Sequence, residues 1–262
     1  MMKRLSLAMA AIGTIALGAA AQAETLTVGA YPANPPWEVK QPDGTFTGFE
    51  VDLVNEIGER LGMEVEFVDL GFQALFAATA SGRIDAAISS ITITEERTQN
   101  QDFTQGYYDA DLAVGVRKDS GVSGLADLDG QPVGVLSTST GEKWAQANQE
   151  EYGFSDIKGY NTQQEMLLDT QAGRVAAAIS DITGFEYSFQ TMTDLTVAER
   201  IPTGDMYAIM LGKDSELSDK LSDAITQIKE DGTMAALYEK HLGATPGPET
   251  STVMVLERPT AE

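Results

Sequence analysis

The chain contains no cysteine and only one histidine, His241. The absence of cysteine excludes disulfide bonds, thiolate metal sites and a cysteine nucleophile. No Ser-His pair, metal-binding cluster or glycine-rich phosphate loop is evident, so we expect no catalytic residue, no metal site and no cofactor. Basic residues are also scarce, with 17 Lys and Arg against 40 Asp and Glu and a formal net charge of -23. Because such an acidic surface repels nucleic acid, that class of partner is excluded.

The one long apolar run lies at the amino terminus. Residues 1–4 include Lys3 and Arg4, residues 5–20 are apolar or small, and Ala21-Gln22-Ala23 has the small-x-small pattern of a signal-peptidase site. The run is short for a membrane span, which needs about 20 residues. We therefore expect a cleaved signal peptide over residues 1–23 and export to the periplasm. A lipid anchor is excluded because no cysteine follows the signal.

The rest of the chain alternates between strand and helix patterns, and the order occurs twice. The first set comprises expected strands at 25–30, 64–68 and 84–88 with helices at 50–61 and 72–80. The second set comprises strands at 132–136, 156–160 and 175–179 with helices at 141–151 and 163–172. The alternation predicts an α/β protein of two similar lobes, each with a mostly parallel sheet flanked by helices.

The domain boundaries follow from this repeat. Lobe 1 is expected to comprise residues 24–108 together with 206–243, which include amphipathic helices at 215–229 and 234–242, and lobe 2 residues 109–205. The chain then crosses between the lobes twice, near Tyr107-Tyr108 and near Thr203–Met206, and we expect these two strands to form a hinge. Residues 244–262 are rich in Pro and Thr and are expected to form a mobile tail.

Polar residues follow several of the predicted strands, at the strand ends where open α/β sheets bind ligands. In lobe 1 these residues are Tyr31, Ser89-Ser90 and Thr92, and in lobe 2 they are residues 137–141 and Asp181. Each has an ordinary structural interpretation as well, since 137–141 could be a capped loop and Asp181 a helix N-cap.

Arg97 follows the first group within one turn of a predicted helix. Its guanidinium offers a planar fork of donors for a carboxylate, although Arg97 could also simply be solvated behind an N-cap at Thr94. The free N–H groups at a helix start near Thr140 would suit the same anion. Asp181 could hold an ammonium group. Together the three features predict a site for a zwitterion in the cleft.

Several motifs, in order and spacing, are similar to those of one known family. They are Pro35-Pro36-Trp37-Glu38, Gly48-Phe49-Glu50-Val51-Asp52-Leu53, Ser81-Gly82-Arg83-Ile84-Asp85-Ala86, Thr92-Ile93-Thr94-Glu95-Glu96-Arg97, Asp102-Phe103-Thr104 and Gly134-Val135 with its following loop. Over residues 26–242 the chain resembles the polar amino-acid-binding proteins of the bacterial family-3 extracellular solute-binding group. The resemblance implies a type II periplasmic binding protein fold and capture of an amino acid or derivative for the membrane permease of an ABC importer.

The resemblance also assigns roles to individual residues. It places the ligand carboxylate on Arg97, with Thr92 and the N–H of Thr140 or Gly141. It places the α-ammonium group on Ser90 and Asp181. It places Phe72 against the ligand side chain, and it makes Leu136 and Ser139 lining residues of lobe 2.

Two positions depart from the family's pattern. Tyr31 stands where many relatives have an acid that recognises basic or amide side chains, and Asn34 stands where many have an aromatic ring. Trp37 or Tyr31 could supply the missing ring. The departures predict that a cationic ligand side chain is disfavoured. We expect a monomer, and the alternative functions are a periplasmic dehydratase-type enzyme on the same scaffold and a soluble sensor module.

Overall fold

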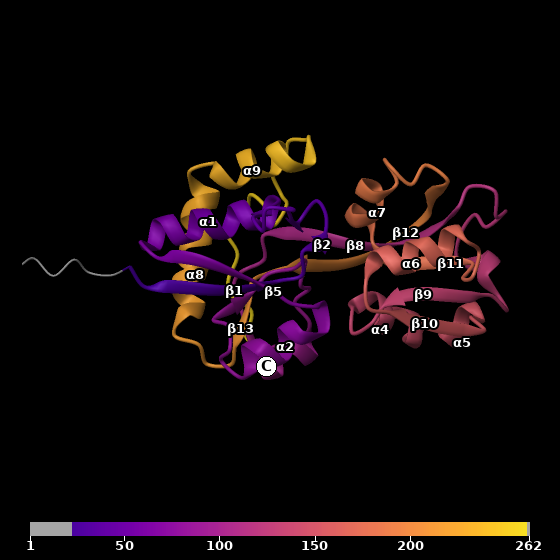
Figure 1. The fold of residues 1–262 in the computed structure, drawn as a ribbon, viewed down its shortest axis with the longest axis horizontal. Coiled ribbons are helices and arrows are strands. Elements are labelled where there is room, and N and C mark those ends of the chain that lie inside the picture. Colours follow the sequence, from indigo (N-terminus) through magenta and orange to yellow (C-terminus); the bar gives the residue numbers. More distant parts are fainter. Residues whose placement is uncertain (1–22, 261–262) are drawn as a thin grey trace, which may run out of the picture.

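The computed structural model describes residues 23–260, which form two lobes joined by a pair of long strands (Figure 1). The predicted signal peptide lies, except for its last residue, outside the described range. Within that range, no helix combines the length and the apolar character that crossing a membrane requires.

Lobe 1 is built on a five-stranded mixed sheet in the order β5-β1-β6-β13-β7. The three strands predicted from the sequence run parallel to each other, and β13 pairs antiparallel with both β6 and β7. The strands are β1 (Thr25–Ala30), β5 (Glu64–Asp69), β6 (Ala86–Ala87), β7 (Gln101–Phe103) and β13 (Met210–Gly212). A small antiparallel sheet beside them contains β2 (Ala33–Asn34), β3 (Glu38–Lys40) and β4 (Phe46–Thr47).

The helices of lobe 1 lie on both faces of its sheet (Figure 1). Helix α1 (Phe49–Leu61) buries Leu53, Val54 and Ile57, and Gly62 ends it with the left-handed backbone (φ 66°) that the sequence predicts for a C-cap. The other helices are α2 (Phe72–Ala80), α3 (Glu95–Asn100), α8 (Leu217–Glu230) and α9 (Thr233–Leu242).

Lobe 2 repeats the arrangement with a sheet in the order β10-β9-β11-β8-β12. The parallel strands are β9 (Pro132–Leu136), β10 (Asp156–Tyr160) and β11 (Ala177–Asp181). Strand β8 (Tyr108–Arg117) pairs antiparallel with both β11 and β12 (Leu195–Tyr207). Its helices are the short 3-10 helix η1 (Leu125–Leu128), α4 (Thr140–Ala147), α5 (Gln149–Tyr152), α6 (Gln163–Gln171) and α7 (Ile182–Ser188). The single helix expected over 141–151 is therefore two helices, which meet at Asn148.

Strands β8 and β12 connect the lobes, and they run side by side from lobe 1 into the sheet of lobe 2 (Figure 1). Tyr108 is paired with Tyr207 at the lobe 1 end. The pairing register shifts between Ile201 and Asp205, so the strands are irregular close to the crossing. These are the two segments from which the sequence predicts a hinge.

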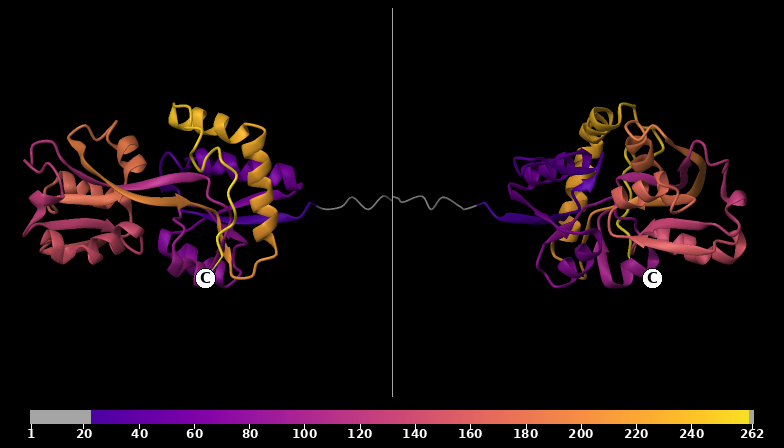
Figure 2. Two further views of the ribbon diagram at one scale, coloured as in Figure 1. Left: turned by 180° about the vertical axis from the view of Figure 1, so that it is seen from behind. Right: turned by 45° about the vertical axis from the view of Figure 1, so that its right-hand side comes forward.

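The carboxyl-terminal segment, residues 244–260, does not extend freely from lobe 1 as a mobile tail would. It descends along lobe 1 beside α8 (Figure 2). Thr252 is 1% exposed, and Lys229 of α8 donates to the carbonyl of Met254 at 2.9 Å. Composition rich in Pro and Thr suggested mobility, but these turns cover a buried cation that needs carbonyl acceptors.

Candidate ligand-binding site between the lobes

A small cavity lies between the lobes and is lined by both. Lobe 1 contributes Tyr31, Asn34, Phe72, Ser90, Thr92 and Arg97. Lobe 2 contributes Leu136, Ser139, Thr140, Gln163 and Asp181. Most of these residues follow the carboxyl ends of parallel strands, as expected for open α/β sheets. The cavity volume is about 20 Å³, which is enough for about one water molecule. A larger ligand can enter only if the lobes part.

Arg97 is the cation of this cavity. It lies in the first turn of α3, after the N-cap Thr94, and is 7% exposed. Its Nη1 donates to the carbonyl of Thr92 at 2.8 Å, and its guanidinium lies 4.9 Å from the centre of the Phe76 ring. No carboxylate within residues 23–260 forms an ion pair with it. Burial lowers the pKa of the guanidinium to about 10, against the opposing effect of Asp181.

A buried cation without an anionic partner is costly, and ionised groups in protein interiors are normally paired. Arg97 remains charged at neutral pH despite the lowered pKa. Carbonyl groups and an aromatic ring surround the guanidinium, so it can still form an ion pair with one anion. A carboxylate that enters the cavity would meet this charge at a site from which water is largely excluded, where charge-assisted hydrogen bonds are strong.

Asp181 is the anion of the cavity. It is the last residue of β11 and the N-cap of α7, but its side chain makes no capping hydrogen bond. Burial raises the pKa of its carboxyl to about 6, and a hydrogen bond with Tyr207 favours the ionised form. The N-cap interpretation is thus only half realised, because the carboxylate is not used for the helix. It is available for a cationic group.

Two residues of the cavity region have strained backbones. Ser90 has φ 45° and Thr138 has φ 66°, a backbone conformation that residues other than Gly, Asn and Asp adopt rarely. Such residues cost of order 1–3 kcal/mol each and persist only where their surroundings hold them. The strain at Thr138 points its carbonyl at Arg97 Nη2, 3.2 Å away in the other lobe. Part of the cavity wall is thus a contact between the lobes.

The start of α4 provides the second anion-binding feature. Ser139 caps the helix, and its hydroxyl accepts the N–H of Glu142 at 3.1 Å. The N–H groups of Thr140 and Gly141 are in the first turn, where a helix offers them no acceptor. Thr140 lines the same cavity as Arg97, so a carboxylate could be bound from both lobes.

Two of the residues predicted from the sequence do not line the cavity. Trp37 is fully buried in lobe 1, where its ring packs edge-on against Phe49, Tyr108 and Tyr207. It cannot replace the missing ligand-stacking ring, because the Pro35-Pro36 turn directs it into the core. Gly141 is a packing residue: a Cβ there would lie 2.9 Å from the carbonyl of Ile179, so only glycine lets α4 approach β11 this closely.

Gln163 lines the cavity but was not predicted. It is the first residue of α6, directly after the N-cap Thr162, and it is 6% exposed. The rule that ligands bind beyond strand ends could have identified it, because it follows β10. The capping pattern Thr162-x-x-Glu165 accounts for the segment without any ligand, so the sequence does not single out Gln163 as a binding residue.

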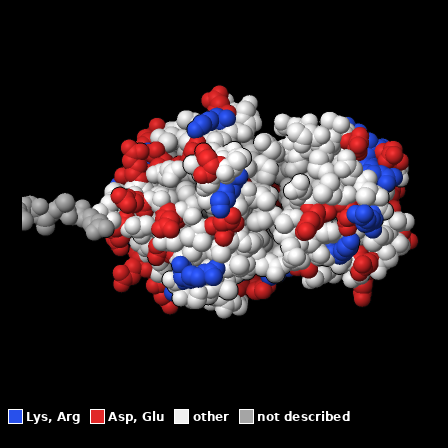
Figure 3. Space-filling view, viewed as in Figure 1, with Lys and Arg blue, Asp and Glu red and all other residues white. Residues whose placement is uncertain are grey.

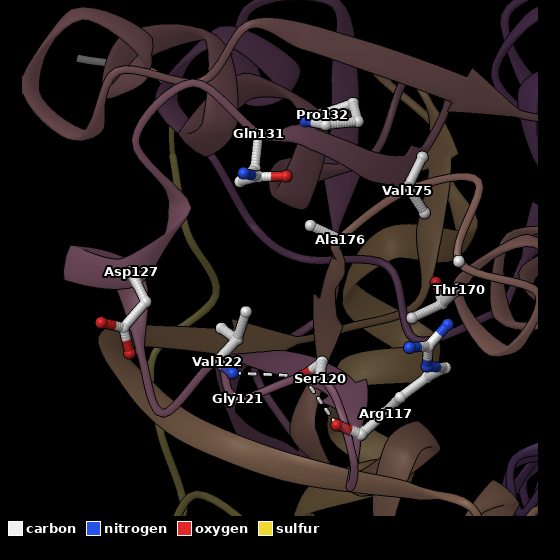
Figure 4. Close-up of a pocket in the computed structure, with 11 residues that line it drawn as sticks. Arg117, Ser120, Gly121, Val122, Asp127, Gln131, Pro132, Thr170, Val175 and Ala176 are labelled. Carbon is white, nitrogen blue, oxygen red and sulfur yellow. Dashed lines mark hydrogen bonds between the residues drawn. The ribbon is translucent and has the colours of Figure 1, made fainter.

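A larger hollow of about 360 Å³ lies in lobe 2, where Arg117, Gln131 and Thr170 are among its lining residues (Figure 4). Its polar groups bond to each other: Ser120 donates to the carbonyl of Arg117 and accepts the N–H of Val122. The Arg117 guanidinium pairs with Asp119. This hollow lies at the amino ends of the parallel strands β9 and β11, and its Arg117 guanidinium is paired, so we place the site in the smaller cavity between the lobes. Among the described residues, no cluster of acidic or histidine side chains could hold a metal ion.

Comparison with known proteins gives the family. The model of the bacterial extracellular solute-binding proteins, family 3, matches residues 26–244. The chain belongs to this family. It is 33% identical over 253 residues to the L-arginine-binding protein of Pseudomonas aeruginosa, covering 92% of this chain and 96% of that one.

Solved structures show the same arrangement. An ancestral arginine-binding protein bound to arginine has a TM-score of 0.78 and 33% identity, over 84% of this chain and 98% of that one. An ancestral arginine-binding protein bound to glutamine has a TM-score of 0.78 and 32% identity, over 85% and 100%. The type II fold with two lobes is thereby confirmed, as is the function of a substrate-binding component for amino-acid import.

Proposed function

We propose that the protein captures one α-amino acid in zwitterionic form by closing its lobes around it. The proposal rests on the cavity between the lobes. There the buried Arg97 guanidinium of lobe 1 has no ion-pair partner among residues 23–260, and the Asp181 carboxylate of lobe 2 makes no capping hydrogen bond. Arg97, with the Thr140 N–H group, would bind the α-carboxylate. Asp181 and Ser90 would bind the α-ammonium group. Each charged end of the ligand thus satisfies a group that is costly to leave alone.

The ligand side chain is proposed to be uncharged. Among residues 23–260, Asp181 is the one acid that lines the cavity, so a cationic side chain would find no second carboxylate there after the α-ammonium group is bound. For the ligand side chain, the cavity offers Tyr31, Gln163 and the ring of Phe72. The P. aeruginosa relative is named for L-arginine, which makes arginine the most informative competitor to test.

The test is calorimetric titration with a panel of the proteinogenic L-amino acids, preceded by a thermal-shift screen. We expect one or a few uncharged polar amino acids to bind, and the N-acetyl and methyl-ester derivatives of the best ligand to bind at least about 10-fold more weakly, since a charge-assisted hydrogen bond contributes about 1.5–3 kcal/mol. Equal binding of the blocked derivatives would contradict the zwitterion clamp. Tighter binding of arginine or lysine would contradict the side-chain assignment alone.

The remaining assignments follow from family membership. The proposed partner is the membrane permease of an ABC importer, the proposed compartment is the periplasm after signal-peptide removal, and the protein is proposed to act as a monomer. We propose that it has no enzymatic activity. His241, the single histidine, pairs with Asp52 on α1 and does not line the cavity. Turnover of prephenate or arogenate by the purified protein would contradict this and favour a dehydratase.

A further inference from the structure

Two buried glutamates lie behind the amino-group end of the cavity, and the binding mode described above does not use them. Glu38 is the first residue of β3, and Glu50 is in the first turn of α1. Both are 0% exposed, and their carboxyl groups are hydrogen-bonded to each other. Within the described range, neither forms an ion pair with a basic side chain.

The donors around the pair are few and specific. One oxygen of Glu38, Oε1, accepts the Ser89 hydroxyl and, at 3.4 Å, the amide nitrogen of Asn34. One oxygen of Glu50, Oε1, accepts the Ser90 N–H at 2.8 Å and the Tyr107 hydroxyl. The second oxygen of each carboxyl, Oε2, has no donor among residues 23–260.

Two ionised carboxylates would therefore meet as acceptors with no proton between them and no cation nearby. Like charges in contact and out of water cannot both persist, as in other carboxyl pairs that retain one proton. A single proton held between Glu38 and Glu50 removes one charge and supplies the missing donor.

The pair is connected to the ligand cavity through two lining residues. The Glu50 carboxylate holds the N–H of Ser90, the residue whose positive φ must be maintained by its surroundings. Asn34 donates to both Glu38 and the Ser90 hydroxyl, the latter at 2.9 Å. A change in the pair would therefore alter the position of the Ser90 hydroxyl and of the Asn34 amide.

We propose that Glu38 and Glu50 form a proton-sharing carboxyl pair that positions Ser90 and Asn34 for the ligand's amino group and places one negative charge behind it. They are positioning residues, since the groups that would touch the ligand are Ser90 and Asn34. The inference rests on the proposed binding of an α-ammonium group at this end of the cavity.

The electrostatic surroundings agree with this assignment. Burial, followed by the charge of Glu50, raises the pKa of Glu38 well above its ordinary value, and burial also raises the pKa of Glu50, so the pair holds a proton more tightly than solvated carboxyl groups do. The other titratable groups that face the pair are Tyr31, Tyr107, Tyr207 and Asp181. None of these is a cation, so no neighbour would favour a second negative charge.

The decisive experiment detects the proton without any ligand. Infrared spectra of the full protein at neutral pH, with and without ¹³C-labelled glutamate, would report the carbonyl stretch of an un-ionised glutamic acid. We expect this band in the natural protein and its loss in both Glu38→Gln and Glu50→Gln, because one amide then donates to the remaining carboxylate. Glu59→Gln, an exposed position on the same helix, is the matched control and should retain the band. Absence of the band in the natural protein, or its survival in both variants, would overturn the shared proton.

The positioning role is tested by ligand affinity, with the amino acid that gives the largest thermal shift in the panel as the probe. Glu38→Gln should retain affinity within about 10-fold because its amide can take the place of the proton, whereas Glu50→Ala, which removes the acceptor of Ser90, should lose more than that. Unchanged affinity in Glu50→Ala would overturn positioning. If Glu50→Ala does not fold, the dependence of ligand affinity on pH is measured in Glu50→Gln and in the natural protein. Different pH profiles support the positioning role, and identical profiles overturn it. Failure of the whole panel to bind would refute the proposed function and leave the infrared result standing.

Discussion

The two lobes share a topology but differ in what they bury. Each has a five-stranded mixed sheet, yet lobe 1 carries the buried cation Arg97 and the buried acids Glu38 and Glu50, whereas lobe 2 contributes the carboxylate of Asp181 to the cavity. Lobe 1 is also reinforced by α8, α9 and the carboxyl-terminal segment. The difference indicates that the repeated fold is a common frame. The two charged groups that line the cavity, Arg97 and Asp181, come from different lobes, so in the proposed binding mode neither lobe alone matches the ligand.

Removing the charge of lobe 1 is expected to have the largest effect on ligand affinity. In Arg97→Met we expect amino-acid affinity to fall by about 100-fold or more, because at least two charge-assisted hydrogen bonds of about 1.5–3 kcal/mol each are lost. The melting temperature without ligand should be unchanged or higher, since an unpaired buried cation is removed. Calorimetry and thermal melts test both parts. Arg83→Met, an exposed residue of the same lobe, is the control, and an equal loss of affinity there would contradict the assignment.

The charge of lobe 2 is expected to have a smaller effect that depends on pH. Because the ligand's ammonium group binds the ionised carboxylate, affinity should fall as the pH drops through about 6, the raised pKa of Asp181. Asp181→Asn should lower affinity by about 10-fold or more and flatten this pH profile. Without ligand the sign reverses: the folded state holds the proton more tightly than the unfolded one, so the natural protein loses stability as the pH rises to about 6 and Asp181→Asn does not. A pH profile unchanged by the substitution would contradict the role of Asp181.

Lobe 1 alone should depend on the carboxyl-terminal segment. Lys229 is 5% exposed and donates to Gln105 Oε1, to the carbonyl of Gly106 and to the carbonyl of Met254. Burial lowers its pKa to about 8. Deletion of residues 244–262 should lower the free energy of unfolding by about 1–3 kcal/mol, the cost of leaving one polar group without its partner. Ligand affinity should change little. Denaturant unfolding would measure the loss of stability, and calorimetric titration would measure the affinity.

The smallest effect is expected at the rim of the cleft. Lys143 of lobe 2 pairs with Glu96 of lobe 1 across the closed cavity, but their side chains are 43% and 71% exposed. Lys143→Ala should weaken binding only a few-fold, in line with about 0.2–1 kcal/mol for exposed ion pairs. The effect should vanish at high salt, which screens exposed charges. A salt-independent loss would mean that the contribution is not electrostatic.

Much of this architecture was predictable because it depends on local patterns. The helix spacing of 50–61 and the strand at 132–136 specify elements that the structure reproduces almost residue for residue. The polar residues after strands led directly to Tyr31, Ser90 and Asp181 at one cavity. These inferences needed only periodicity and the rule for strand ends.

Other features depend on contacts between distant segments and could not be read from the pattern. Trp37 belongs to the same motif as Glu38, and nothing in the motif shows that its ring packs on the hinge tyrosines. The burial of Glu50 is likewise hidden, since an acid in the first turn of a helix is ordinarily exposed. The composition of residues 244–262 suggests a mobile tail because it does not reveal that this segment covers Lys229.

The most direct test of the account measures closure itself. Since the chain has no cysteine, Gln99→Cys in lobe 1 and Gln146→Cys in lobe 2 would place two spin labels uniquely, both at exposed positions. We expect a saturating amino acid to shift the distance distribution to a single short distance, and the same ligand concentration to leave the distribution broad when Arg97→Met is added. An identical distribution with and without the amino acid in the natural background would contradict the claim that the ligand's two charges draw the lobes together.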